Sequence, residues 1–359
     1  MPSYRRDNQK SQNRKNNGIN IMNSKLTEKR DYLFDNLKAL MLFLVVIGHI
    51  LDPYIERQDS LYRYLMQYIY LFHMPMFAFI TGYFTKNTEK ARNSAVRNVL
   101  VPYIFWQLLY IITALLFIRL GLASYNTDVF KPSLLLPSSP LYYLLCVFVW
   151  KVFAADLKKL RFPVLFSFAA GLFISVVFDE AFHIGWGACF SLMIFFVLGL
   201  LCTKEHVEKI RNIPHAIAAA ILAAAVLPSV LLPYSFRNVR FTYESVGLSP
   251  AQGIGYRALF YLIAILMIGA LINLFPDRKN IFSQVGTNAI LVYAGSSFAA
   301  PALYLLIAKF LPLAGSVWGN LAGMSVFAAV LVLFCSMEWI RKLYDFVMDG
   351  ICKILFRQD

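Results

Sequence analysis

Two polar residues in one apolar stretch of the chain could do chemistry together. His49 lies inside an apolar run at residues 39–51, and Lys38 lies eleven positions before it. At about 100° per residue, eleven helical steps return to within about 20° of the starting face and advance about 16 Å. Lys38 and His49 would therefore share one stripe of one helix. The lysine could hold an anion at the membrane surface, and the histidine could transfer a proton deeper in.

A structural explanation stands beside each chemical one. Taken by itself, Lys38 can be explained as a residue at a helix end whose ammonium group extends to the membrane surface. His49 could be a histidine whose ring is satisfied by a neighbouring helix. An imidazole at membrane depth is costly and tends to mark function, so we favour a general base. Asp52 lies three residues further on, where it either orients that imidazole or ends the helix before Pro53.

A second histidine, His73, lies in the apolar segment at residues 72–84. Pro75 removes a backbone hydrogen bond from a helix in this segment, and Gly82 permits close approach of another helix. One interpretation is that His73 lines the same cavity as His49, where it would position a substrate or assist proton transfer. The alternative is a kinked structural helix with aromatic packing.

Four cations precede the third apolar segment, and the last of them, Arg97, leads directly into Leu100-Val101-Pro102-Tyr103. A guanidinium fork matches phosphate oxygens, so Arg97 is our candidate for binding the phosphates of a cytosolic donor. The alternative is that these cations only mark the cytoplasmic side or contact anionic lipid headgroups. The four residues are Lys86, Lys90, Arg92 and Arg97.

The composition indicates an all-α, polytopic integral membrane bundle. Of 359 residues, 59% are hydrophobic and only 15% are charged, which is unlike a soluble domain. The net charge of +14 does not indicate a nucleic-acid partner, because the cations lie mostly in short loops and the N-terminal tail. Ten spans are predicted, at about 34–52, 65–84, 98–120, 141–155, 162–179, 187–202, 214–233, 256–275, 286–310 and 317–340.

The distribution of lysine and arginine predicts that both termini are cytoplasmic. Residues 1–30 read as a disordered basic tail, residues 31–345 as the transmembrane domain and residues 346–359 as a C-terminal cytoplasmic tail. The predicted outer loops contain few lysines and arginines. The loop at 234–256 is the exception, because it contains Arg237 and Arg240.

Motifs of soluble enzymes are absent from the sequence. There is no glycine-rich nucleotide loop, no serine nucleophile elbow, no HExxH and no CxxC. The five cysteines have no metal or disulfide spacing, and Asp179, Glu180 and His183 lack a fourth ligand, so we expect no metal site. Any chemistry must then use residues within the membrane.

At this point several motifs resemble those of the acyltransferase-3 family of membrane proteins. Phe34-Asp35-Asn36-Leu37-Lys38, followed after ten residues by His49, resembles its first-helix signature. Residues 72–84 resemble its second-helix motif, especially in the branch called fucose 4-O-acetylase and related acetyltransferases. Weaker matches are Arg97 through Tyr103, Pro140-Leu141-Tyr142-Tyr143-Leu144, Phe195-Phe196-Val197-Leu198-Gly199 and Gly286-Thr287-Asn288-Ala289-Ile290-Leu291-Val292-Tyr293. The family often continues the last motif to a histidine, whereas this chain has Ala294 and Gly295.

The resemblance implies transfer of an acyl group, usually acetyl, from cytosolic acyl-CoA to a carbohydrate. We therefore expect an O-acyltransferase of the bacterial plasma membrane that acts on a cell-surface glycan or its lipid-linked precursor. Acyl-CoA would be a substrate, with no permanently bound cofactor, and membrane lipids would surround the protein. Expected catalytic residues are His49, His73 and Asp52, and expected substrate-binding residues are Lys38, Arg97 and Asp35. The alternative is a polysaccharide transporter or flippase without acyl transfer.

The first prediction concerns His49. Replacing it with alanine should lower acyl transfer about 10²–10⁴-fold, because a general base contributes about that much, while the protein still inserts and folds. Transfer assays on purified wild type and His49→Ala test this, with size-exclusion profiles as the folding control. Wild-type activity in the variant would exclude His49 as the base.

Overall fold

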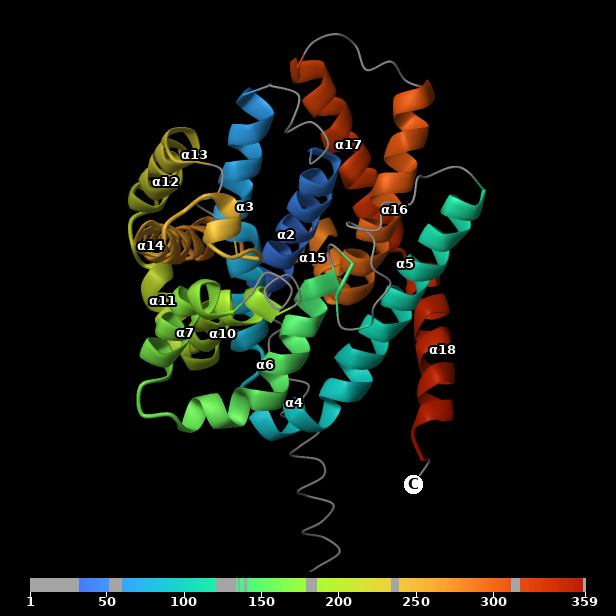
Figure 1. The fold of residues 1–359 in the computed structure, drawn as a ribbon, viewed down its shortest axis with the longest axis horizontal. Coiled ribbons are helices and arrows are strands. Elements are labelled where there is room, and N and C mark those ends of the chain that lie inside the picture. The colour runs from blue at the N-terminus through green and yellow to red at the C-terminus, as the bar shows by residue number, and fades with distance from the viewer. Residues whose placement is uncertain are drawn as a thin grey trace, which may run out of the picture. The chain divides into compact units, whose positions relative to one another are not determined.

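The computed structural model describes residues 32–51, 60–120, 134, 136–138, 141–178, 186–233, 239–310 and 317–357, and in these parts the chain is helical with no strand (Figure 1). Residues 33–359 form one compact unit. Its helices are α2 (Tyr32–Leu51), α3 (Ser60–Tyr83), α4 (Thr88–Ala95), the π-helical turn η2 (Val96–Leu100), α5 (Val101–Arg119), α6 (Tyr142–Lys159), α7 (Pro163–Val177), α9 (Ala188–Ser191), α10 (Met193–Leu201), α11 (Lys204–Arg211), α12 (His215–Ala224), α13 (Val226–Leu231), the 3₁₀ turn η6 (Glu244–Val246), α14 (Pro250–Leu274), α15 (Ile281–Thr287), α16 (Ala289–Phe310), α17 (Val317–Cys335) and α18 (Glu338–Leu355).

Each of the ten predicted spans coincides with one of these helices or with two consecutive ones. By length and composition, four helical stretches among the described residues can cross a membrane, and a fifth arises if a pair bent by 96° counts as one span. The all-α fold with several membrane-length helices is thus confirmed, while the count of ten and the side of each terminus stay predictions. The four stretches are Tyr32–Leu51, Thr88–Arg119, Pro250–Leu274 and Val317–Cys335.

Some predictions fall on residues that the structure does not describe. These are Asp52, the tail at 1–30, Arg237 and the group of Asp179, Glu180 and His183. At the other end of the chain, residues 346–355 of the predicted C-terminal tail continue the helix α18, which begins at Glu338.

The basic segment before the third span is helical. Asn87 accepts a hydrogen bond from the Lys90 backbone N–H at 3.0 Å and so starts α4. The helix then runs through η2 into α5, and Pro102, which has no N–H to donate, lies in the first turn of α5. Lys90, Arg92 and Arg97 are consequently held on a rigid element.

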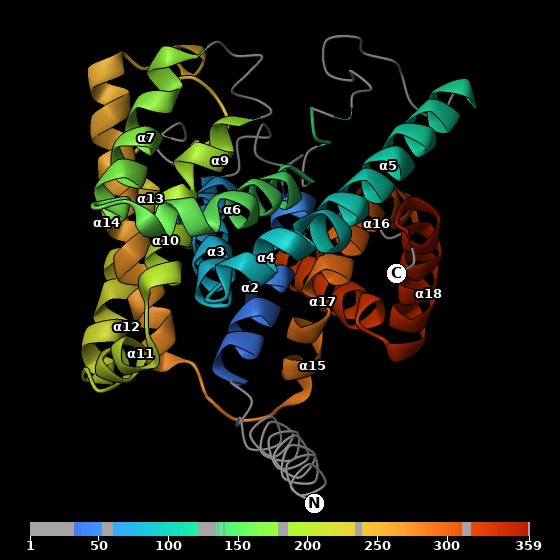
Figure 2. The ribbon, with the colours of Figure 1, turned by 90° about the horizontal axis from the view of Figure 1, so that it is seen from below.

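Close contact between α3 and α10 organises one side of the bundle (Figure 2). A Cβ atom added at Gly82 would lie 1.9 Å from the Phe196 carbonyl oxygen, and one added at Gly199 would lie 1.9 Å from the Phe79 carbonyl oxygen. Only glycine at both positions lets the two backbones touch. This contact gives a physical reason for Gly82 in the motif at 72–84 and for Gly199 at the end of the motif at 195–199.

The second prediction concerns this contact. Gly82→Ala should destabilise the protein by about 1–3 kcal/mol, because the new methyl group meets backbone rather than a movable side chain. Gly269→Ala in α14 is the matched control, since a Cβ there meets no atom within 4 Å. Thermal unfolding in detergent should show a lower midpoint for Gly82→Ala alone. Equal midpoints would mean that the two backbones do not approach this closely.

Candidate functional site

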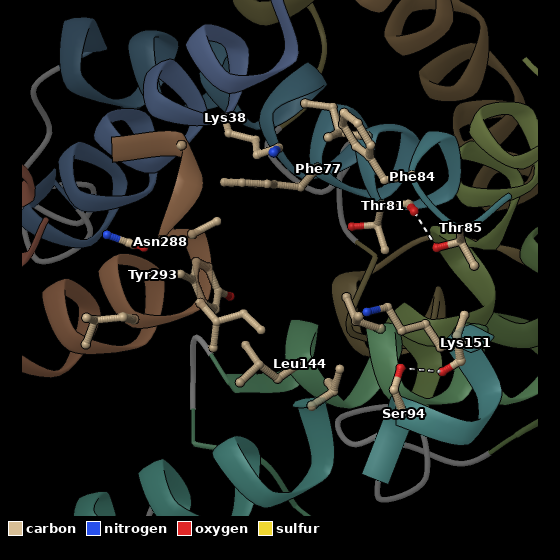
Figure 3. Close-up of a pocket in the computed structure, with 18 of the residues that line it drawn as sticks. Lys38, Phe77, Thr81, Phe84, Thr85, Ser94, Leu144, Lys151, Asn288 and Tyr293 are labelled. Atoms are coloured by element: carbon tan, nitrogen blue, oxygen red, sulfur yellow. Dashed lines mark hydrogen bonds between the residues drawn. The ribbon is translucent and has the colours of Figure 1, made fainter. Parts of the chain in front are cut away.

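A cavity of about 800 Å³ lies among α2, α3, α4, α6, α16 and α18 (Figure 3). Among the described residues, its lining contains five cations and one acid, Asp345, so the cavity is suited to an anionic ligand. Its size falls within the usual range for small-molecule sites. The cations are Lys38, Lys86, Lys90, Lys151 and Arg341.

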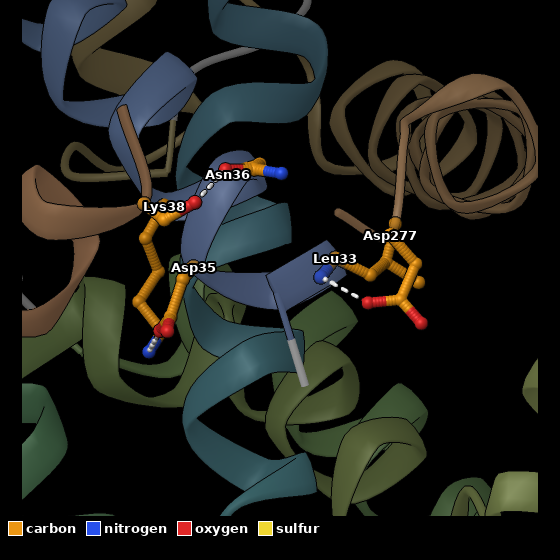
Figure 4. A network of polar contacts seen from close by, with 6 residues as sticks. Leu33, Asp35, Asn36, Lys38 and Asp277 are labelled. Carbon is orange, nitrogen blue, oxygen red and sulfur yellow. Dashed lines mark hydrogen bonds and ion pairs between the residues drawn. The ribbon is translucent and has the colours of Figure 1, made fainter. Parts of the chain in front are cut away.

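Lys38 projects into this cavity from α2, and its partners fix the position of its ammonium group (Figure 4). The Nζ atom lies 3.0 Å from Asp35 Oδ1 and 4.8 Å from the centroid of the Phe84 ring. Asp35, expected to bind substrate, is buried and acts here as the partner of Lys38. The ion pair with Asp35 and the contact with the Phe84 ring restrict the lysine side chain, which still lines the cavity.

The first turn of α2 is held by the segment that links α14 to α15 (Figure 4). Asn36 donates from Nδ2 to the carbonyl oxygens of Pro276 at 3.0 Å and Arg278 at 3.1 Å. Its Oδ1 accepts from Ser283 Oγ at 2.7 Å. A Cβ added at Gly286 would lie 2.2 Å from the Asp35 carbonyl oxygen, so α15 packs directly on this turn.

Aromatic rings form another wall of the cavity. The ring centroids of Phe77, Tyr143 and Tyr293 are 5.7 to 6.2 Å apart from one another, and all three residues line the cavity. The Tyr143 hydroxyl lies 2.8 Å from Thr81 Oγ1, and either atom can donate. This aromatic cluster of Phe77, Tyr143 and Tyr293 therefore combines apolar faces with polar hydroxyl groups.

His49 lies in the last turn of α2 and is not among the described residues that line the cavity. Arg240 is close enough to interact with it electrostatically. The Arg240 guanidinium lies 4.8 Å from the centroid of the Tyr142 ring, and the next residue, Tyr143, belongs to the aromatic cluster. The first two residues of α6 therefore connect the cavity wall to the surroundings of His49.

His73 is buried in α3, and it is also absent from the described lining of the cavity. Its Nδ1 atom lies 2.9 Å from the Ile69 carbonyl oxygen. A carbonyl oxygen can only accept a hydrogen bond, so Nδ1 carries a proton and donates it to Ile69. The centroid of the Tyr70 ring lies 4.5 Å from that of the His73 ring. The same tyrosine ring packs against Gly48, the residue before His49, where an added Cβ atom would meet it. Tyr70 thus connects the neighbourhoods of the two histidines.

The four cations before the third span have different partners. Lys86 caps α10 by donating to the carbonyl oxygens of Gly199, Leu200 and Cys202 at 2.5 to 2.8 Å. Burial lowers the pKa of the Lys86 ammonium from its ordinary value; Cys202 opposes this shift and Lys158 adds to it.

The other three cations divide between the cavity and structural ion pairs. Arg92 pairs with Asp156 of α6 at 2.5 Å, and Lys90 lines the cavity. Arg97 lies 3.7 Å from Asp349, its side chain is 62% exposed, and it is not among the described lining residues.

Three cations near these sites were not selected from the sequence. Arg341 lies near the end of the predicted transmembrane domain and Arg240 in the outer loop at 234–256, and no local pattern places either one at a site. Lys151 does carry a signal, because it lies inside the predicted span 141–155. The cost of a charge at membrane depth, which drew attention to His49, applies equally to Lys151.

Comparisons with known proteins find a matching family and partial matches to relatives. The family described as acyltransferase domain, the acyltransferase-3 family, matches residues 31–343. Nodulation protein NolL of Sinorhizobium fredii (strain NBRC 101917 / NGR234) is 36% identical over 86 residues, which are 21% of this chain and 23% of the relative. Nodulation protein NolL of Mesorhizobium japonicum is 35% identical over 89 residues, 22% of this chain and 24% of the relative. The matches thus span less than a quarter of these relatives. No solved structure matches the chain.

The third prediction concerns the turn that positions Lys38. Asn36→Ala should lower the free energy of unfolding by about 1–3 kcal/mol, because it leaves buried polar groups without partners. Ser245→Ala is the control, since its Oγ donates to the Thr242 carbonyl oxygen in an exposed turn. Thermal unfolding of the two variants in detergent compares these losses. If they are equal, the Asn36 bonds do not hold α2.

Proposed function

Because the chain belongs to the acyltransferase-3 family, we propose that it transfers an acetyl group from acetyl-CoA to a sugar hydroxyl. The acceptor is a cell-surface glycan or its lipid-linked precursor, and the enzyme resides in a bacterial plasma membrane. Membrane-length helices and the bacterial sources of its relatives support that location. The observation that carries the proposal is the cavity with five cations and one acid in its described lining.

The phosphates of the donor bind at the cationic part of this cavity. Lys38, Lys90, Lys151 and Arg341 supply positive charge from four different helices. Arginine can meet a phosphate with a bidentate fork, and lysine acts as a point charge. Asp35 contributes indirectly, because it orients Lys38. The alternative phosphate-binding residue is Arg97, the candidate from the sequence, which lies on the exposed surface of η2.

The acyl thioester then lies against the aromatic cluster. The faces of the aromatic rings give an apolar surface for the acetyl methyl group. The hydroxyl groups of Tyr143 and Thr81 offer hydrogen bonds to the thioester oxygen. Tyr142, next to Tyr143 in the chain, packs against Arg240 near His49. The reacting group is thereby directed toward the histidine.

His49 acts on the acceptor as general base or carries the acyl group itself. In the first route it takes the proton from the sugar hydroxyl, whose oxygen attacks the thioester carbonyl. The CoA sulfur leaves with the bonding electrons and receives that proton from the imidazolium. In the second route the His49 nitrogen attacks the thioester carbonyl and CoA leaves as a thiolate. The sugar oxygen then attacks the acyl-histidine, His49 leaves as imidazole, and the hydroxyl proton passes to the CoA thiolate. His73 positions the donor or assists proton transfer, and Asp52 orients the His49 imidazole.

The proposal is tested by mass spectrometry of the surface glycan from cells with and without the protein. Loss of acetyl groups without the protein, restored by wild type but not by His49→Ala, is the expected result. A transporter or flippase predicts another pattern, in which the glycan itself is lost from the surface and His49→Ala restores it. Transfer of labelled acetyl groups by purified protein provides the direct assay.

The fourth prediction assigns the donor site. Lys38→Met and Lys151→Met should each weaken acetyl-CoA binding roughly tenfold or more, as expected for losing a hydrogen bond to a charged group. Lys159→Met, at the exposed end of α6, is the matched control. Calorimetric titration of the detergent-solubilised variants measures the affinities.

Two further variants separate the cavity from the alternative donor site. If Arg97 binds phosphate, Arg97→Ala weakens binding and Arg97→Lys restores it only partly, because an ammonium cannot form the bidentate contact. If the cavity binds the donor, both variants resemble Lys159→Met. Equal affinities for Lys38→Met, Lys151→Met and Lys159→Met would remove the cavity as the donor site.

A further inference from the structure

The last described helix, α18, has three distinct faces. At about 100° per residue, Trp339, Leu343, Phe346 and Ile354 fall within an arc of about 80°. These four apolar side chains are 58 to 86% exposed. We call this surface the apolar stripe of α18.

A charged stripe adjoins the apolar stripe. Its residues occupy a neighbouring arc of about 80° on the same helix. Lys342 and Glu338 form an ion pair at 3.1 Å, with side chains 70% and 60% exposed. The charged stripe consists of Glu338, Lys342, Asp345, Asp349 and Lys353.

The third face points into the protein. Met348 and Cys352 are buried, and the Tyr344 ring stacks on Trp106 of α5 at 6.2 Å. Arg341 and Tyr344 also line the cationic cavity, and so does Asp345, at the edge of the charged stripe nearest this face. One side of α18 therefore forms part of the cavity wall.

The charges of α18 distinguish it from a membrane span. The helix has 18 residues, six of them charged, and it is not among the stretches apolar enough to cross a membrane. A helix with an apolar stripe beside a charged stripe instead suits the plane of the membrane interface. Tryptophan, here Trp339, is enriched at that depth.

Next to the apolar stripe, α18 packs beside an exposed apolar surface of α5. Figures 1 and 2 place α18 beside α5, which belongs to the membrane-length stretch Thr88–Arg119. A groove of about 240 Å³ between them is lined, among described residues, only by apolar side chains, including Ile351 and Leu355. On α5, Leu108 and Ile112 line this groove and are 44% and 60% exposed.

We propose that α18 is an interfacial helix whose apolar stripe is buried in the bilayer while its charged stripe faces water. The partner is the boundary between lipid headgroups and acyl chains. The helix sequence contains three acids and three bases, so apolar burial rather than attraction to anionic lipid holds it there. Because α18 forms one wall of the cavity, the bilayer would also position a wall of the donor site. Only this last consequence rests on the proposed function.

Thiol labelling in nanodiscs tests the orientation of α18 without any activity assay. Phe346→Cys and Lys342→Cys lie one turn apart, on the apolar and the charged stripe. The wild type gives the background rate, because its five cysteines are buried. A membrane-impermeant maleimide should modify Lys342→Cys about tenfold or more faster than Phe346→Cys, since only the charged stripe faces water. After denaturation both should react equally.

A second measurement uses the fluorescence of Trp339, isolated as the difference between wild type and Trp339→Phe. Phospholipids with brominated acyl chains should quench it, and aqueous iodide should not. Rapid labelling of both cysteines, with quenching by iodide, would place the apolar stripe in water and overturn the proposal. Slow labelling of both without quenching by brominated lipid would indicate a protein partner, such as a second copy, and would also overturn it. Neither readout depends on acyl transfer, so failure of the proposed function leaves this test intact.

Discussion

The position of Lys38 depends on the hydrogen bonds that hold the buried first turn of α2 in place. Polar groups removed from water must find partners, and Asn36 finds three of them in a segment about 240 residues away in the chain. Asp35, beside it, pairs with Lys38 and packs against Gly286. The cation therefore reaches the cavity from a fixed turn, and the motif around Gly286 provides the surface against which this turn packs.

The aromatic cluster of Phe77, Tyr143 and Tyr293 forms one wall of the cationic cavity. Lysine and arginine side chains from several helices create a positive cavity on one side of it, and Arg240 accompanies His49 near Tyr142 on another. The cluster combines rings from three helices, Phe77 from α3, Tyr143 from α6 and Tyr293 from α16. In the proposed function, this wall meets the reacting end of the donor with an apolar, hydroxyl-bearing surface while the cations hold its charged part.

The sequence was most informative where one helix carries the signal. The apolar run and the spacing of Lys38 from His49 place both on α2, and the Pro75 segment lies in α3 as expected. It was less informative for the basic segment before α5. Four neighbouring cations form one group in sequence, yet Lys86 caps α10, Arg92 pairs with Asp156, Lys90 lines the cavity and Arg97 lies near Asp349. Their partners come from other helices, so local pattern could not separate them.

The sequence by itself determined that the chain is helical, contains membrane-length apolar segments and belongs with acyltransferases, because composition and short motifs are local properties. Only the tertiary structure decided which cations share a cavity. Lys38, Lys151 and Arg341 are far apart in the chain, and they meet because helix packing brings their faces together. The tertiary structure likewise joined the end of the predicted transmembrane domain and the start of the predicted tail into one helix, α18, whose Arg341 and Tyr344 line the cavity. Side-chain direction relative to neighbouring helices is a property of packing, and no single segment encodes it.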